Sequence, residues 1–136
     1  MKEVIFTGIA TALYTPITNG EIDYEEFERL IEFQLRSDIA ALVFLGTTGE
    51  AATISDEERK SIIGFAVKRV KGRVPVIIGC GSNSTKRAAE LTMQAKSLGA
   101  DCSLSVTPYY NKCSQDGLIA HYFEIEKQSA FPQIVY

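Results

Sequence analysis

The sequence has few of the residues that build metal sites or disulfide frameworks. Its 136 residues include one histidine, His121, and three cysteines, Cys80, Cys102 and Cys113. The cysteine spacing fits no zinc pattern, so we expect no metal site. An odd number of cysteines in a chain without a secretory signal favours reduced thiols and a cytoplasmic location.

Long apolar runs and a strong charge of one sign are also missing. No stretch approaches the length of a membrane helix, and the N-terminus carries an acid in place of a long apolar leader. The net charge is −3 with scattered basic residues, which gives no footprint for nucleic acid. With 46% hydrophobic residues the chain can bury a core. We therefore expect one domain over residues 1–136, with small molecules as ligands and neither membrane nor nucleic acid as a partner.

What the chain does have is a regular alternation of apolar runs and helical patterns. The apolar runs, each bounded by turn residues, predict strands at a spacing of roughly thirty residues. No hairpin signal is recognised between them, so we expect the strand–helix repeat of a parallel sheet. The predicted strands cover residues 6–14, 40–45, 74–79 and 101–106, and a fifth covers residues 132–136.

Capping residues mark where the helices between these strands begin and end. Asp23 with Glu26, and Ser55 with Glu58, have the spacing of a capping box. Gly72 stands where a glycine commonly closes a helix. These signals predict one helix after each strand.

Two closures of such a sheet compete, an open doubly wound sheet and an eight-stranded barrel. The segment of residues 79–84 lacks the third glycine of the dinucleotide fingerprint, and the chain has no GxxxxGK phosphate loop. A barrel of typically about 250 residues allots about thirty to each strand–helix unit. The predicted fold is therefore α/β, the N-terminal half of a (β/α)8 TIM barrel, with four units and the start of a fifth strand.

Hydroxyl-bearing side chains follow two of the predicted strands and end a third, at the edge where parallel α/β folds bind ligands. Thr47 and Thr48, between glycines, can offer hydroxyls and backbone N–H groups to a carboxylate. Tyr110 and Tyr136 add phenolic hydroxyls, and the set could relay a proton. The alternatives are an ordinary turn for the threonines, packing at the rim or at a subunit contact for Tyr109 and Tyr110, and an ordinary strand aromatic for Tyr136.

Three motifs together closely resemble the dihydrodipicolinate synthase family, within the pyruvate-dependent class I aldolases. They are Gly46-Thr47-Thr48-Gly49-Glu50, Gly79-Cys80-Gly81-Ser82-Asn83 and Thr107-Pro108-Tyr109-Tyr110-Asn111-Lys112. The resemblance covers the N-terminal half of that family's barrel. The double threonine with Tyr-Tyr-Asn-Lys favours this family over its siblings, N-acetylneuraminate lyase and keto-deoxy-sugar acid aldolases. A non-catalytic half-barrel that serves as an assembly unit is a further alternative.

The resemblance implies a lyase of lysine and diaminopimelate biosynthesis, which works without a cofactor and forms a dimer or tetramer. It implies that a lysine condenses with pyruvate to form a Schiff base, and that the resulting enamine attacks aspartate semialdehyde. Thr48 matches the ligand of the pyruvate carboxylate. Thr47, Tyr110 and Tyr136 match the proton relay, in which Tyr110 reaches into the neighbouring subunit. The family's lysine belongs to the sixth strand, and no lysine here lies on a predicted strand, so we expect the chain alone to be inactive.

The resemblance also bears on regulation. In members that lysine inhibits, the effector binds at the dimer interface, and Asn83 and Tyr109 fit that site. Arg87 stands where those members carry a glutamate that binds the effector's ammonium group. A base in place of that acid would repel the ammonium, so we expect weak or absent feedback by lysine.

Overall fold

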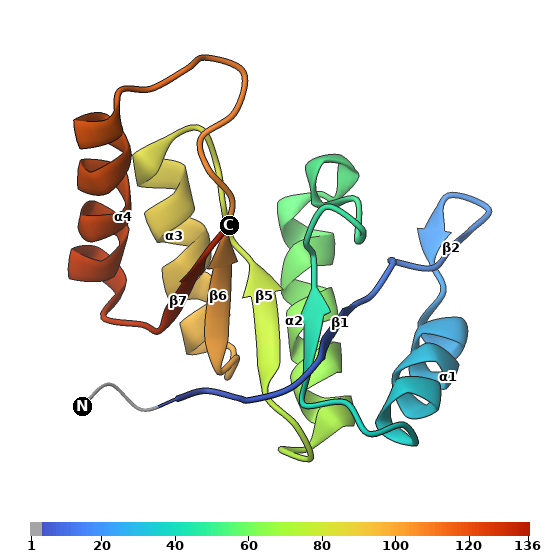
Figure 1. Cartoon of the computed structure of the whole chain (residues 1–136). Helices are drawn as coiled ribbons and strands as arrows, with labels where there is room; N and C mark the ends of the chain where they lie inside the picture. The colour runs from blue at the N-terminus through green and yellow to red at the C-terminus, as the bar shows by residue number, and fades with distance from the viewer. Residues whose placement is uncertain (1–3) are drawn as a thin grey trace.

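The computed structural model of the protein describes residues 4–136, and its centre is a five-stranded parallel sheet in the order β1-β4-β5-β6-β7. Four helices alternate with the strands and lie along one side of the sheet (Figure 1). This order confirms the predicted strand–helix repeat. The strands are β1 (Ala10–Ala12), β4 (Ala41–Phe44), β5 (Val76–Gly79), β6 (Cys102–Ser105) and β7 (Gln133–Val135), and the helices are α1 (Tyr24–Leu35), α2 (Asp56–Val70), α3 (Thr85–Ser97) and α4 (Gln115–Ser129).

The two faces of the sheet are covered to different extents. Alternate residues of β4 point to opposite faces: Leu42 and Phe44 join the large core cluster between the sheet and the helices. Ala41 and Val43 join a smaller cluster on the other face, which Ile5 and other partly buried residues cover. All four residues of β4 are buried, as the unbroken apolar run predicts for a strand enclosed on both faces.

A small antiparallel hairpin precedes α1, and the prediction that no hairpin occurs is wrong here. The strands β2 (Ile17–Thr18) and β3 (Glu21–Ile22) pair around Asn19 and Gly20. Both turn residues have positive φ, 53° and 84°, as the common two-residue hairpin turn requires. The Asn-Gly dipeptide was the signal, although it marks only two residues of strand on each side.

The capping box predicted at Ser55 is confirmed and the one predicted at Asp23 is half formed. The Glu58 amide donates to the Ser55 hydroxyl, and the Ser55 amide donates to the Glu58 carboxylate. Asp23 accepts from the Glu26 amide at 2.9 Å, which lowers the pKa of the Asp23 carboxyl. No bond from the Asp23 amide to Glu26 is found in residues 4–136, because the Pro16 carbonyl already accepts from that amide at 2.9 Å.

One predicted boundary moves for a local reason and another is confirmed. The strand predicted over residues 6–14 shrinks to β1, since Gly8 has a φ of 120° and turns the chain before it. Gly72 directly follows Lys71, the C-cap residue of α2, and has a φ of 68°, so the predicted closure of this helix by a glycine is confirmed. His121, predicted at the flank of the last helix, is buried against α3, where its Nδ1 lies 2.9 Å from the Thr85 hydroxyl. Among the described residues, no helix is both long and apolar enough to cross a membrane.

Candidate active site

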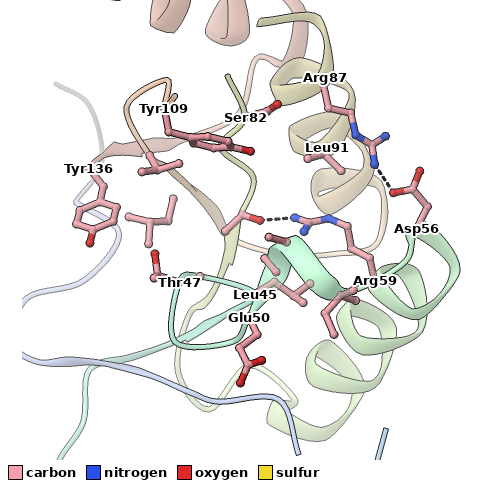
Figure 2. A pocket seen from close by; sticks show the side chains of 18 residues that line it. Leu45, Thr47, Glu50, Asp56, Arg59, Ser82, Arg87, Leu91, Tyr109 and Tyr136 are labelled. Atoms are coloured by element: carbon pink, nitrogen blue, oxygen red, sulfur yellow. Dashed lines mark hydrogen bonds and ion pairs between the residues drawn. The ribbon is translucent and has the colours of Figure 1, made fainter. Parts of the chain in front are cut away.

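A cavity of about 600 Å³ opens at the carboxyl ends of the central strands. It is bounded by the segment that follows β4, by the starts of α2 and α3, and by the ends of β5, β6 and β7 (Figure 2). Thr47 and Tyr136 lie on one side of it, and Arg59, Asp56 and Arg87 lie on the other. This edge of a parallel sheet is where α/β folds bind their ligands.

The threonine loop, residues 46–50, is a tight turn with strained backbone on both sides. Leu45 before it and Glu50 at its end have φ values of 55° and 52°. Within the turn the Gly49 amide donates to the Gly46 carbonyl and the Glu50 amide donates to the Thr47 carbonyl, each at 3.1 Å. The turn ends in the single 3-10 turn η1 (Ala51–Thr53). Left-handed backbone at non-glycine residues persists only where the surroundings impose it, so this turn is held in a fixed shape.

Glycines let the segments at the cavity approach one another. A Cβ on Gly79 would overlap the Leu45 carbonyl oxygen, and a Cβ on Gly81 would lie 2.5 Å from the Val106 amide nitrogen. Any side chain at these two positions would push the ends of β4, β5 and β6 apart. Close backbone contacts therefore require the two glycines of the Gly79–Asn83 motif.

The structure brings two of the three predicted relay residues to the cavity. Thr47 and Tyr136 both line it, and Tyr136 is tied to the end of β6, since its amide donates to the Ser105 carbonyl at 2.9 Å. Tyr110 does not line it and is 94% exposed, with a φ of 77°. Within residues 4–136 no hydrogen bond joins these three hydroxyls, so the predicted relay is not connected in this chain.

The other predicted site residues divide in the same way. Tyr109 lines the cavity, whereas Asn83 is exposed outside it. Thr48 is exposed and also does not line it. Thr48 nonetheless directly follows Thr47, which lines the cavity, in the same fixed turn.

The charged side of the cavity was only partly foreseen. Arg59 is buried, and its guanidinium donates to the Gly79 carbonyl, so it joins α2 to the end of β5. Burial lowers the pKa of this guanidinium. Arg87 pairs with Asp56 across the starts of α3 and α2. Residue pattern alone missed the burial of Arg59, because it stands in a run of charged residues at the start of α2 that is typical of a solvated helix face.

Nucleophiles other than hydroxyls are poorly placed. Burial raises the pKa of the Cys80 thiol to about 11, so the thiol stays protonated and packs as a small apolar group. In the described part of the chain, every lysine is exposed and none lies on a strand, as predicted. They are Lys60, Lys68, Lys71, Lys86, Lys96, Lys112 and Lys127.

A parallel strand–helix repeat with its cavity at the carboxyl ends of the strands is the architecture of a (β/α)8 barrel, here its N-terminal half. The chain belongs to the Dihydrodipicolinate synthetase family, whose model matches residues 5–136. The resemblance seen in the three motifs is thereby confirmed.

Individual relatives agree with this assignment. The chain is similar to the 4-hydroxy-tetrahydrodipicolinate synthases of Kosmotoga olearia, at 54% identity over 132 residues, and of Alkaliphilus oremlandii, at 52% over 132 residues. Each alignment covers 97% of this chain and 45% or 46% of the relative, so the chain spans about half the length of these curated relatives.

Solved structures match as well. The dihydrodipicolinate synthase of Thermotoga maritima has a TM-score of 0.96 and 44% identity over 98% of this chain and 45% of its own. The chloride-inhibited dihydrodipicolinate synthase of Acinetobacter baumannii, complexed with pyruvate, has a TM-score of 0.92 and 42% identity over 98% of this chain and 46% of its own.

Proposed function

We propose that the protein carrying this chain is a 4-hydroxy-tetrahydrodipicolinate synthase, a cytoplasmic lyase that condenses pyruvate with aspartate semialdehyde through a Schiff base. The observation that carries the proposal is the cavity at the strand ends, where Thr47 and Tyr136 lie together in a chain of this family. The pyruvate complex of the Acinetobacter baumannii relative supports pyruvate as the first substrate. The nucleophilic lysine would come from a sixth strand outside this chain, since the lysines described here are exposed on helices and loops.

Each proposed role follows from the chemistry of the side chain. Thr48 would bind the pyruvate carboxylate with its hydroxyl and its backbone N–H, since the residue is exposed and follows Thr47, which lines the cavity. Thr47 and Tyr136 would move a proton between solvent and the reacting carbon, because a hydroxyl can donate and accept at once. Water would be excluded only when the remaining barrel and a neighbouring subunit cover the rim.

Tyr110 supports assembly into a homo-oligomer. Its left-handed backbone costs about 1–3 kcal/mol, and its ring is 94% exposed. A strained residue that directs an aromatic ring away from its own chain is arranged for contact with another surface. In a dimer or tetramer, that ring would complete the relay in the neighbouring subunit.

A second candidate, a non-catalytic half-barrel that assembles with others, is favoured by the edges of the sheet. The strands β1 and β7 each have one partner in the five-stranded sheet. Ile9 beside β1 is 70% exposed and Val135 in β7 is 58% exposed. Unpaired apolar edges promote association of chains, so we expect the 136-residue chain in isolation not to be a stable monomer.

Two measurements separate the candidates. The protein carrying this chain is incubated with pyruvate and aspartate semialdehyde, with N-acetylneuraminate, and with a keto-deoxy-sugar acid, and the products are followed by mass spectrometry. Condensation of the first pair supports the synthase, whereas cleavage of a sugar acid favours a sibling aldolase. Turnover of none of them, with a defined oligomer by light scattering, favours the assembly unit.

A further inference from the structure

A hydroxyl from the segment that follows β1 reaches the threonine loop. Thr15 is buried, and its Oγ1 donates to the Gly49 carbonyl at 2.8 Å across 34 residues of sequence. Pro16 follows it, and a residue before proline is restricted to extended backbone. The backbone of Thr15 is therefore restricted by its own chain, independently of the loop that its hydroxyl binds.

Gly49 is enclosed where it receives this bond. A Cβ at Gly49 would lie 3.0 Å from the Leu45 amide nitrogen and 3.2 Å from the Leu13 carbonyl oxygen. Leu13 in turn donates its amide to the Val43 carbonyl at 2.9 Å, which continues the pairing of β1 with β4. The end of the threonine loop is thus held between the strand that precedes it and the segment that leaves β1.

The loop needs such an anchor because its shape is unfavourable by itself. Leu45 and Glu50 are both left-handed, and Thr47 and Thr48 between them are exposed to solvent. The hydrogen bonds inside the turn involve Gly46 with Gly49 and Thr47 with Glu50, so they do not tie it to the sheet. The Thr15 hydroxyl ties it to the segment that follows β1.

We propose that Thr15 is a positioning residue: its hydroxyl holds Gly49 so that Thr47 and Thr48 keep the geometry that receives a carboxylate. Thr15 does not line the cavity and acts through Gly49. The proposal rests on the proposed function, in which that carboxylate is the carboxylate of pyruvate. It predicts that removal of one buried hydroxyl outside the cavity weakens pyruvate binding.

The first test compares Thr15→Val, which removes the hydroxyl, with Thr15→Ser, which keeps it. Thr92→Val is the matched control: the Thr92 hydroxyl is also buried and donates to a carbonyl, that of Ala88, at 2.8 Å, but it belongs to α3 and Thr92 does not line the cavity. We expect Thr15→Val to raise the KM for pyruvate about tenfold in the assembled protein, well below its melting temperature. Thr15→Ser should restore the KM to within about twofold, and Thr92→Val should leave it unchanged.

The second readout does not depend on turnover. Hydrogen exchange at the Gly49 and Glu50 amides should be faster in Thr15→Val and unchanged in Thr92→Val, because only the first variant frees the turn. If Thr15→Val does not fold, Thr15→Ala against Thr15→Ser makes the same comparison.

The proposal is overturned if Thr15→Val keeps the wild-type KM, if both valine variants raise KM equally, or if exchange at the turn does not change. If the wild-type protein does not act on pyruvate, the proposed function fails. The exchange measurement then still decides whether Thr15 anchors the turn.

Discussion

The two loops that supply the candidate hydroxyls are supported very differently. The threonine loop is pinned by the Thr15 hydroxyl and by its own turn hydrogen bonds, and the glycine at position 79 lets β5 approach Leu45 behind it. In the tyrosine loop, residues 107–114, Tyr110 has no such cover, and every residue from 109 to 117 is exposed. One loop is shaped by this chain alone. The other leaves the ring of Tyr110 exposed in this chain.

The largest expected effect comes from the backbone contact behind the threonine loop. Gly79→Ala should destabilise the fold by about 3 kcal/mol or more, because its Cβ would overlap the Leu45 carbonyl and strands β4 and β5 would have to separate. Gly64→Ala is the control: nothing lies within 4 Å of its new Cβ in α2, so it should stabilise by about 0.5–1 kcal/mol. Denaturant unfolding measures both. Equal stability of Gly79→Ala and wild type would contradict the packing described here.

Tyr110→Phe tests the proposed role of the tyrosine loop. If Tyr110 belongs to the relay, loss of its hydroxyl should lower kcat by at least about 100-fold. The melting temperature should stay the same, because the hydroxyl is exposed and makes no contact in the described chain. Tyr24→Phe, on α1 and away from the cavity, should leave kcat unchanged. A lower melting temperature with normal turnover would instead assign Tyr110 to packing.

Thr48→Val separates pyruvate binding from proton transfer within the threonine loop. A lost carboxylate contact should raise the KM for pyruvate about tenfold and change kcat less. Thr48→Ser keeps the hydroxyl and should lie close to wild type. Steady-state kinetics over a range of pyruvate concentrations give both constants, and an unchanged KM in Thr48→Val would remove Thr48 from the pyruvate site.

The smallest expected effect concerns the charged side of the cavity. Arg87, paired with Asp56, places a cation at the cavity that Tyr109 also lines, and we expect this cation to repel an ammonium group. Lysine should therefore inhibit the protein weakly or not at all. A dose–response curve with lysine at saturating pyruvate checks this, and inhibition at micromolar lysine would show that the cation does not exclude the effector.

Much of the fold could be predicted because its signals are local. The unbroken apolar run before Gly46 predicted a strand enclosed on both faces, and Ser55 with Glu58 predicted the start of α2. The topology then placed Thr47 and Tyr136 at one edge, which the structure confirms. Errors arose where a signal was short, as at Asn19-Gly20, or where a competing partner took the bond, as Pro16 does at Asp23.

The fine geometry of the site could not be predicted, because tertiary contacts impose it. Nothing in a leucine indicates left-handed backbone, yet Leu45 adopts it, with its carbonyl against Gly79. The hydroxyl of Thr15 finds its acceptor 34 residues away, so its role follows only from the folded chain. The exposure of Tyr110 likewise depends on which surfaces surround the loop.

The central proposal is that this chain would supply the rim hydroxyls of a Schiff-base enzyme but not its nucleophile. Borohydride reduction of the protein in the presence of pyruvate, followed by peptide mass spectrometry, tests it most directly. We expect no pyruvyl adduct on any lysine of these 136 residues, and an adduct on a lysine outside them when the protein contains further sequence. A stoichiometric adduct within this chain, at Lys112 of the tyrosine loop or any other lysine, would contradict the account.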